Sequence, residues 1–390
     1  MKEGWEYKKL GEVCDRVSNI KWQNVPSDAV YSYVDLTAVD RDSLNITETQ
    51  SINNENAPSR AKQIIKENDV LFGTTRPTLK RFCIVEDKND GNICSTGFCV
   101  LRPNNKIVSS KWVFYQLMAD KFYAYIEPLQ SGAAYPAVTD GIVKSYIIPI
   151  PSLSEQQHIV EELDLLSSII EKKKAQLNEL DNLAQSLFYE MFGDPITNEK
   201  GWEKKCLSEL CGRVNNIRWQ EVLDEKTYNY VDLTAVDRTS HCIEETTMIK
   251  KGDAPSRAKQ IIRTNDVLFG TTRPTLKRVC LVNKEYNDSI CSTGFCVLRP
   301  LEDFVSSKWL FHLLLSNSFY SYIEPLQSGA SYPAVSDNIV KSFSACIPPI
   351  ILQNQFASKI EAIEHQKELI KKSIKEVETL FSSRMDYYFI

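Results

Sequence analysis

Two clusters of basic side chains carry the clearest chemical signal in this 390-residue chain. Six lysines and arginines stand against two acids in residues 57–82, and six stand against one acid in residues 254–279. Since the formal net charge of the whole chain is −5, this positive charge is local. Guanidinium and ammonium groups bind phosphates, and arginine also reads base edges. The basic residues that we expect to contact DNA are Arg60, Lys62, Arg76, Lys80, Arg81, Arg257, Lys259, Arg273, Lys277 and Arg278.

Hydroxyl, amide and aromatic side chains accompany each cluster. Threonine pairs at 74–75 and 271–272 lie between a glycine and an Arg-Pro step, where hydroxyl and backbone N–H groups suit phosphates and base edges. A later segment, IEPLQSGAAYPAV, returns as IEPLQSGASYPAV. The expected contributors are Thr74, Thr75, Gln130, Ser131, Tyr135, Thr271, Thr272, Gln327, Ser328 and Tyr332. Two other interpretations stay open: a solvated basic face that pairs with acidic helices, and a packed turn before the last strand.

Motifs for catalysis are missing from the sequence. It contains no phosphate-binding loop, dinucleotide-binding glycine motif, nucleophile elbow or zinc-protease helix motif. The four histidines, His158, His241, His312 and His365, do not recur at matching positions of the two halves described below. We therefore expect a chain that is not an enzyme and has no catalytic, cofactor-binding or metal-binding residue.

Two alternatives from other functional classes remain. In a metal-dependent nuclease with duplicated heads, Glu67, Asp69, Glu86 and Asp87 could hold the metal, but only Asp69 recurs, as Asp266. A scaffold whose heads bind protein instead of DNA is the other alternative. Cleavage of DNA by the purified chain would favour the first, and failure to bind duplex DNA at low salt would favour the second.

The cysteines indicate the compartment and part of the core. Eleven cysteines in a chain whose N-terminus lacks an apolar leader indicate a reduced, cytoplasmic protein, and no apolar run approaches the ~20 residues of a membrane span. Three cysteines recur, but ten and four intervening residues do not fit the close pairs of a zinc site. We expect a buried apolar role for Cys83, Cys94, Cys99, Cys280, Cys291 and Cys296.

A duplication organises these residues. YVDLTAVDR at Tyr33–Arg41 returns unchanged at Tyr230–Arg238, and NDVLFGTTRPTLKR at Asn68–Arg81 returns at Asn265–Arg278, both with an offset of 197. Within each half, runs rich in β-branched and aromatic residues between Asn, Asp, Gly and Pro predict strands and turns. Ser109–Tyr125 predicts one helix with a serine start and an apolar stripe.

A heptad pattern follows each head. Apolar residues step by four and three over several repeats, which predicts a long helix that wraps around a partner helix. The pattern recurs 197 residues later, so the partner lies in the same chain. The expected seam residues are Ile159, Leu163, Leu166, Ile170, Leu177, Leu180, Ile360, Ile363, Ile370, Ile374 and Val377.

These observations predict an α+β protein in which two pseudo-twofold-related, mainly-β α/β heads are separated by two long helices packed as an antiparallel coiled coil. The expected boundaries are a first head at 1–151, a spacer helix at 152–193, a linker at 194–200, a second head at 201–348 and a second spacer helix at 349–390.

The chain resembles the specificity subunits of Type I restriction-modification systems. The resemblance rests on the GWE…KLGEVC start, the IPIPSLSEQQHIV segment before the first long helix, its degenerate copy IPPIILQNQFA, and the MFGDP…NEKGW linker. It covers essentially the whole chain. The second copy keeps Gln353 and Gln355 but has lost the glutamate of the first.

This resemblance implies a function and partners. Each head would be a target recognition domain that reads one half of a bipartite site in double-stranded DNA. The helices would act as a ruler and as the docking surface for two modification subunits, which bring S-adenosylmethionine and methylate adenine N6, and restriction subunits would join that complex. Because the two heads here are nearly identical, unlike those typical of the family, we expect an interrupted palindrome as the target.

Overall fold

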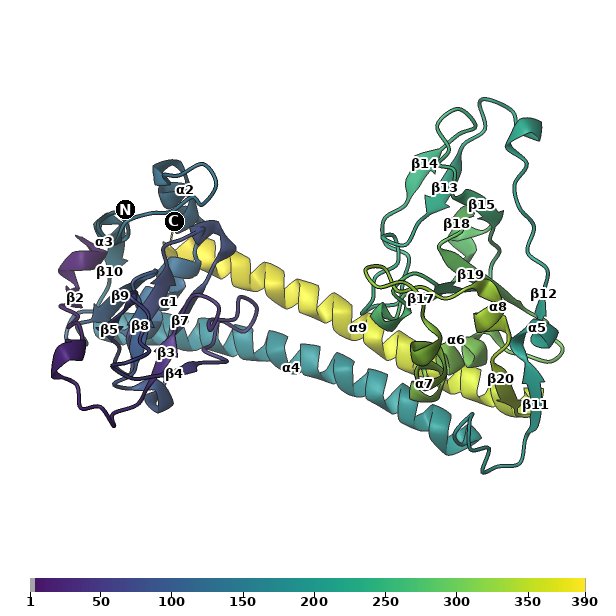
Figure 1. The fold of residues 1–390 in the computed structure, drawn as a ribbon. Coiled ribbons are helices and arrows are strands. Elements are labelled where there is room, and N and C mark those ends of the chain that lie inside the picture. Colours follow the sequence, from purple (N-terminus) through teal and green to yellow (C-terminus); the bar gives the residue numbers. More distant parts are fainter. Residues whose placement is uncertain (1–3, 390) are drawn as a thin grey trace. The chain divides into compact units, whose positions relative to one another are not determined.

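The computed structural model describes residues 4–389 and divides into two compact units. Unit 1 contains the chain up to Lys173 together with Ser373 onward, and unit 2 contains Lys174–Lys372. Each unit combines one head with one part of each of two 40-residue helices, α4 (Leu153–Phe192) and α9 (Ile350–Phe389) (Figure 1). Head 1 precedes α4, and head 2 lies between α4 and α9 in the chain. This α+β architecture confirms the predicted fold class.

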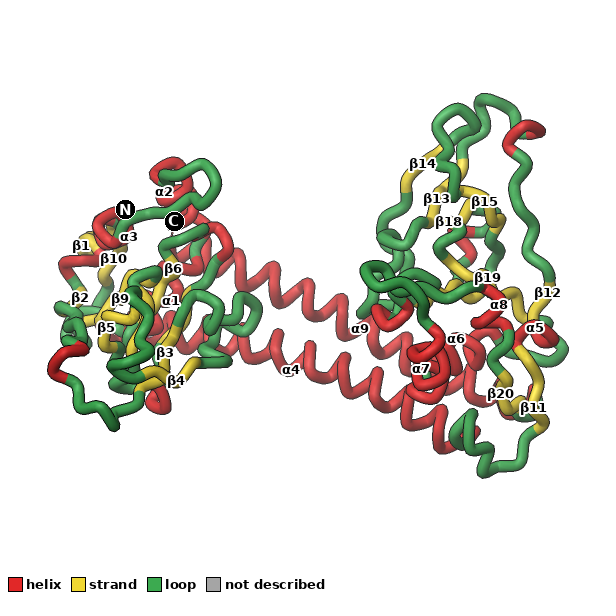
Figure 2. Tube along the Cα trace, in the orientation of Figure 1, coloured by secondary structure: helices red, strands yellow, loops and turns green. Residues whose placement is uncertain are grey.

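Head 1 contains three small sheets connected by long loops (Figure 2). The first has the strand order β4-β3-β8-β5, with β3 and β8 parallel, and the second has the order β2-β9-β6-β7 and is antiparallel. The third pairs β1 with β10. The strands are β1 (Glu6–Lys9), β2 (Cys14–Asp15), β3 (Tyr31–Val34), β4 (Gln50–Ile52), β5 (Ala61–Ile64), β6 (Val70–Gly73), β7 (Phe82–Ile84), β8 (Ile93–Ser95), β9 (Phe98–Pro103) and β10 (Ile147–Ile150).

Strand β6 is buried along its whole length because both faces of its sheet are covered. Successive side chains of a strand point to opposite faces. Val70 and Phe72 therefore join the core formed with the helices, whereas Leu71 joins Cys83 and Phe98 in the layer toward the first sheet. The loops that leave this rigid strand begin from a fixed position.

The helices of head 1 are α1 (Ser110–Met118), α2 (Asp120–Ile126) and α3 (Asp140–Ser145). The single helix predicted over Ser109–Tyr125 is thus wrong in one respect, since Ala119 has extended backbone angles (φ −65°, ψ 137°) and separates α1 from α2. In head 2 the same break falls at Ser316, whose hydroxyl accepts a hydrogen bond from Phe319 N and caps the next helix. Only in the second copy does a capping residue mark the start of the second helix in the sequence.

Head 2 repeats this arrangement with the sheet orders β14-β13-β18-β15, β12-β19-β16-β17 and β11-β20. Its strands are β11 (Glu203–Cys206), β12 (Cys211–Gly212), β13 (Tyr228–Val231), β14 (Thr247–Ile249), β15 (Ala258–Ile261), β16 (Val267–Gly270), β17 (Val279–Leu281), β18 (Ile290–Ser292), β19 (Phe295–Pro300) and β20 (Ser344–Ile347). Its helices are α5 (Leu207–Leu210), α6 (Ser307–Leu315), α7 (Asn317–Ile323) and α8 (Asp337–Lys341).

The last turns of each long helix are built into the core of a head. In unit 1, Phe389 near the end of α9 lies against Trp112 of α1, with ring centroids 4.9 Å apart, and Met385 joins the same core. In unit 2, Phe192 at the end of α4 packs against Trp309 and Phe356, with ring centroids 6.4 and 5.2 Å apart. Each head is therefore completed by the C-terminal end of a helix that starts in the other unit.

A buried glutamine fixes the start of each long helix. The amide of Gln156 donates to the carbonyls of Ile107 and Pro151 and accepts from Ser109 N. Gln353 repeats all three hydrogen bonds with Phe304, Pro348 and Ser306. A buried amide whose hydrogen bonds are all satisfied is difficult to replace. This explains why the second copy of the motif keeps Gln353.

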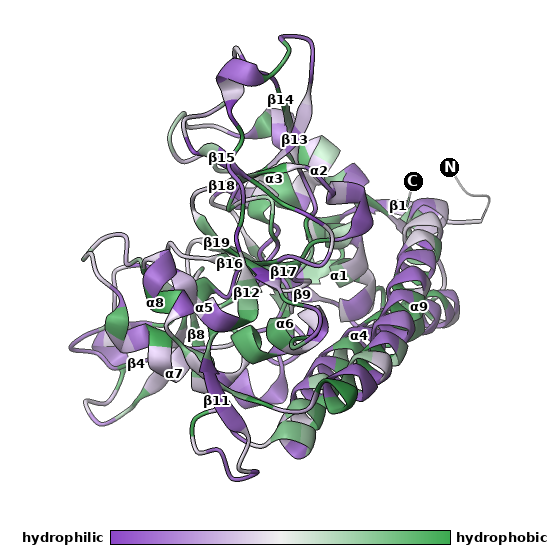
Figure 3. Ribbon diagram, turned by 90° about the vertical axis from the view of Figure 1, so that its right-hand side faces the viewer, coloured by the Kyte–Doolittle hydropathy of each residue, from purple (hydrophilic) through white to green (hydrophobic). Residues whose placement is uncertain are grey.

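The predicted seam residues of α4 and α9 are all buried or half-buried, while the outer positions are mostly polar (Figure 3). Within unit 2, Asp181 pairs with Lys367 and Phe188 packs against Phe356, so α9 numbers fall as α4 numbers rise and the helices are antiparallel. Within unit 1, Glu162 of α4 pairs with Arg384 at 2.8 Å and accepts from the Tyr388 hydroxyl. None of the described helices is long and apolar enough to cross a membrane.

Candidate nucleic-acid interface

Two loops of head 1 are held side by side by main-chain hydrogen bonds. The first leaves β6 and runs through Thr74–Arg76 into a short 3₁₀ turn, Pro77–Leu79. The second is Gln130–Ala137. Arg76 N donates to Pro136 O at 2.6 Å, and Val138 N donates to Thr74 O at 2.9 Å. The structure thus brings together two predicted segments that are more than 50 residues apart in the chain.

An arginine and a tyrosine stack at the tip of these loops. The Arg76 guanidinium carbon lies 4.7 Å from the centre of the Tyr135 ring, a cation–π distance. Both side chains are exposed, and 68% of the Tyr135 surface is accessible. The stacked pair presents guanidinium N–H groups, an aromatic face and a hydroxyl to solvent. These are the groups that read base edges and contact phosphates.

The backbone at this tip takes conformations that most residues avoid. Arg76 and Lys80 both have left-handed angles, with φ of 48° and 53°, which costs ~1–3 kcal/mol per residue. Gly132 has φ +98°, and a Cβ there would lie 2.8 Å from Tyr135 O. Such strain is concentrated where a loop must present side chains in one geometry.

Head 2 reproduces the same tip. Arg273 has φ 49° and its guanidinium carbon lies 4.6 Å from the centre of the Tyr332 ring. Arg273 N donates to Pro333 O at 2.7 Å, and Val335 N donates to Thr271 O at 3.0 Å. Because the local sequences and geometries agree, the two heads present the same chemistry.

Several predicted contact residues have structural roles at this tip. The buried hydroxyls of Thr74 and Thr271 donate to Gly97 O and Gly294 O, each at 2.8 Å, so they hold the loop instead of facing solvent. Half-buried Arg81 donates to Leu36 O at 2.9 Å. Thr75 and Thr272 are half-buried, Arg278 is half-buried, and Ser131 and Ser328 are exposed.

The side chains of the two tip lysines and of the glutamines contact neighbouring elements. Lys80 Nζ lies 4.7 Å from the Tyr123 ring centre and 3.4 Å from Asp120 of α2, and Lys277 Nζ lies 4.9 Å from the Tyr320 ring centre. Gln130 and Gln327 donate to the carbonyls three residues earlier, at 3.1 and 3.0 Å. The lysine ammonium groups are at the surface, but their stems are partly fixed.

The turn at Thr96 and Gly97 links Arg60 to the base of the two loops. Thr96 N donates to Arg60 O, and Thr74 N donates to Gly97 O, so one turn touches both segments. Arg60 and Lys62 are exposed, as are Arg257 and Lys259 in head 2. Trp22, which donates to Ala61 O at 2.7 Å, anchors the neighbouring backbone, as Trp219 does through Ala258 O. Both tryptophans therefore fix the backbone at the start of a strand, β5 or β15.

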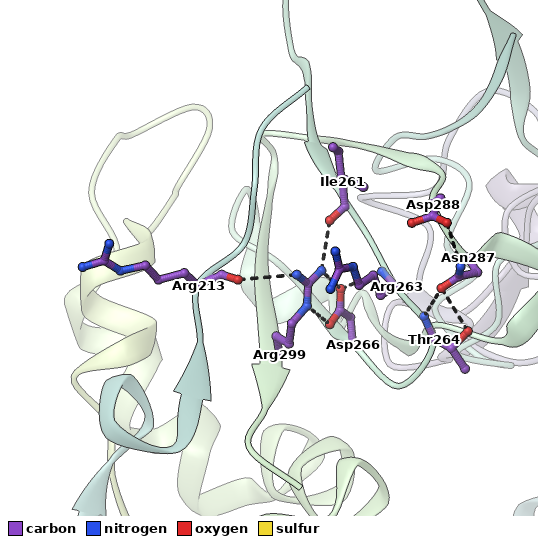
Figure 4. A network of polar contacts seen from close by, with 8 residues as sticks. All are labelled: Arg213, Ile261, Arg263, Thr264, Asp266, Asn287, Asp288 and Arg299. Carbon is purple, nitrogen blue, oxygen red and sulfur yellow. Dashed lines mark hydrogen bonds and ion pairs between the residues drawn. The ribbon is translucent and has the colours of Figure 1, made fainter. Parts of the chain in front are cut away.

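A buried ion pair, which sequence reasoning missed, connects β19 to the start of β16 in head 2 (Figure 4). Arg299 donates to both oxygens of Asp266, at 2.8 and 2.7 Å, and also to Ile261 O. Asp69 and Arg102 form the same pair in head 1, and the hydrogen bond to Asp69 raises the pKa of Arg102. Since Asp69 and Asp266 are buried with both oxygens engaged, the nuclease alternative loses its one recurring carboxylate.

Replacing Arg299 by leucine should destabilise head 2 by about 3 kcal/mol, because it leaves the Asp266 carboxylate buried without its partner. Hydrogen exchange of the β15, β16 and β19 amides measures the loss locally. The Asp69–Arg102 pair is intact in this variant, so the β5, β6 and β9 amides are an internal control. Equal exchange in the two heads would contradict the structural role of the pair.

The recurring cysteines lie in the core, as predicted. All six are buried, and burial raises the pKa of the Cys83 thiol to about 12. Within residues 4–389, no group of three or more His, Cys, Asp and Glu side chains could hold a metal ion. These thiols act as small apolar side chains.

Comparisons with known proteins match both halves of the chain. The family model for the Type I restriction modification DNA specificity domain matches residues 2–182 and again residues 199–379. The chain is similar to the Type I restriction enzyme HindI specificity subunit of Haemophilus influenzae, with 32% identity over 146 residues, which span 36% of this chain and 31% of that protein's length. It is also similar to the MjaIX specificity subunit of Methanocaldococcus jannaschii, with 23% identity over 92% of this chain and 84% of that protein.

A solved structure extends the similarity to three dimensions. A chain described under "Structural basis underlying complex assembly and conformational transition of the type I R-M system" has a TM-score of 0.64 and 25% sequence identity. The alignment covers 99% of this chain and 97% of that chain. The duplicated sheet-rich heads and the paired long helices are therefore shared over the full length.

Proposed function

We propose, for a chain that belongs to the family of Type I restriction-modification specificity subunits, that each of its two heads reads one half of a bipartite site in double-stranded DNA. The observation that carries this proposal is the Arg–Tyr tip, Arg76 with Tyr135 and Arg273 with Tyr332, which occurs twice in nearly the same geometry. Two equal readers in one chain require a target whose two halves are equal. The proposed target is an interrupted palindrome.

The base-reading residues in this proposal are Arg76 and Arg273, each oriented by its tyrosine. Arg60, Lys62, Lys80 and their counterparts Arg257, Lys259 and Lys277 contact phosphates. Arginine hydrogen-bonds guanine in two places at once, whereas lysine acts as a point charge. Phosphate contacts position the head, and the arginine supplies the sequence preference.

The long helices serve as spacer and docking surface. An ion pair joins the two helices in each unit, Asp181–Lys367 in unit 2 and Glu162–Arg384 in unit 1. The length of the helix pair is therefore set by the chain itself. Two modification subunits dock on this chain, bring S-adenosylmethionine and methylate adenine N6, and restriction subunits join them in the cytoplasm. The chain itself recognises DNA and catalyses no step.

DNA binding should be steeply dependent on salt. Eight exposed basic residues belong to the proposed surfaces of the two heads, and neutralising that many phosphates makes affinity fall about 10³–10⁵-fold between 50 and 200 mM salt. A fluorescence-anisotropy titration of the chain with its methyltransferase partner over a salt series measures the slope. Failure to bind duplex DNA at the lowest salt would instead favour the protein-binding scaffold.

A further inference from the structure

Unit 2 contains a cavity between its head and its part of the helix pair. It has a volume of about 620 Å³, within the range of small-molecule sites. Its apolar walls come from α4 and α9, through Phe188, Ile360 and Ile363, and from α6, through Phe311 and Leu315. The histidines His241 and His312 line the same space.

Three residues that line this space differ from their repeat-related counterparts. At the positions related by the repeat to Ala184, His312 and His241, unit 1 has Phe381, Tyr115 and Leu44. In unit 1, the rings of Tyr115 and Phe381 lie 6.3 Å apart, the Tyr115 hydroxyl donates to Asp164 at 2.7 Å, and Leu44 and Phe381 pack on the core. Unit 2 has smaller or more polar side chains at all three positions.

The charge of the wall is also reversed relative to the positions that the repeat relates to it. Five lysines and three acids line the cavity, whereas the positions related to them by the 197-residue repeat hold three lysines and six acids. Lys308 pairs with Glu361 and Glu364, and Lys367 pairs with Asp181. No carboxylate of the described chain pairs with Lys277, Lys284 or Lys371. The wall therefore has an excess of ammonium groups, which suits an anion.

Two neutral imidazoles add hydrogen-bonding groups beside aromatic rings. His312 packs between Phe311 and Phe356, with both ring centroids at 5.2 Å, and burial together with nearby Lys308 and Lys367 lowers its pKa to about 3. His241 Nδ1 is buried without a hydrogen-bond partner in the described part of the chain. A neutral imidazole can both donate and accept.

We propose that this cavity binds a nucleotide. Its base would stack on Phe311 and hydrogen-bond His241, and its phosphate would bind Lys284 and Lys371. Aromatic side chains bind bases through stacking whatever the base, and lysine is a common phosphate ligand. This site is separate from the Arg–Tyr tip and does not depend on DNA reading.

Isothermal titration of the purified full-length chain with AMP, without DNA, tests this site. We expect one saturable site per chain, with adenosine and inorganic phosphate each binding at least about tenfold more weakly because each makes part of the contacts. The filled variant Ala184→Phe/His241→Leu/His312→Tyr should lose AMP binding. It should fold, because the same three residues pack together at the repeat-related positions of unit 1.

A second variant separates the phosphate contacts from the stacking. Lys284→Asp, which introduces the residue of the first copy, should weaken AMP binding at least about tenfold and leave adenosine binding unchanged. Equal loss for both ligands would contradict a phosphate role for Lys284. Absence of saturable AMP binding, or equal AMP affinity of the parent and the filled variant, would overturn the proposal without affecting the DNA-reading account.

Discussion

Replacing Arg76 and Arg273 together by alanine should remove sequence-selective DNA binding. Each arginine stacks on an exposed tyrosine at the tip of its head, where it is free to contact base edges. One base-reading arginine is worth ~1–3 kcal/mol of discrimination, so the double change should lower selectivity by up to about 10⁴-fold. Competition between target and unrelated duplex DNA measures the ratio of the two affinities.

A matched double variant gives the control for this experiment. Lys8→Ala/Lys205→Ala removes the same two charges at repeat-related positions on β1 and β11, where each lysine already pairs with a nearby glutamate. It should leave the ratio unchanged. If Arg76→Ala/Arg273→Ala protein discriminated as well as the parent, these arginines would not read bases. A variant in which only one of the two arginines is replaced should lose selectivity at one half-site only.

Lengthening both long helices by one heptad should lengthen the gap between the half-sites. Insertions after Lys173 and after Lys372 fall at the boundaries of the two units and leave each head with its own helix ends. Seven residues keep the seam in phase and add ~10 Å, the length of about 3 base pairs. Binding to a series of duplexes with increasing gaps measures the shift.

The lengthened protein should bind its preferred duplex more weakly than the parent binds its own. Widening the gap by about three base pairs also rotates one half-site by about 100° around the DNA axis relative to the other. Seven residues inserted into the linker 194–200 serve as the control and should leave the preferred gap unchanged. An unchanged gap after the paired helix insertions would show that something other than helix length sets the spacing.

The long-range plan of the molecule could be predicted because it repeats in sequence. An offset of 197 residues and a heptad seam are patterns along the chain, and the seam residues from Ile159 to Val377 lie inside the helix pair. The burial of the recurring cysteines followed from their apolar surroundings. The Arg–Tyr tip was predicted as two separate segments, but their stacking was not, since contact between loops is a property of the folded chain.

Other features left no local signal. The break at Ala119 has no capping side chain, and tertiary packing overrides the helical pattern there. Thr74 looked like a phosphate ligand by composition, yet its hydroxyl is used inside the head. Asp69 and Arg102 lie 33 residues apart with nothing in the sequence to pair them. The cavity of unit 2 is lined by residues that are distant in sequence, among them Ala184, His241 and His312.

Methylation mapping tests the central proposal, that two equal heads read equal half-sites, most directly. The chain is produced with its methyltransferase partner, and the methylated adenines of the genome are located by sequencing. We expect one interrupted palindrome, with the same half-site methylated on each strand. A motif whose two halves differ in sequence would contradict equal reading by the two heads.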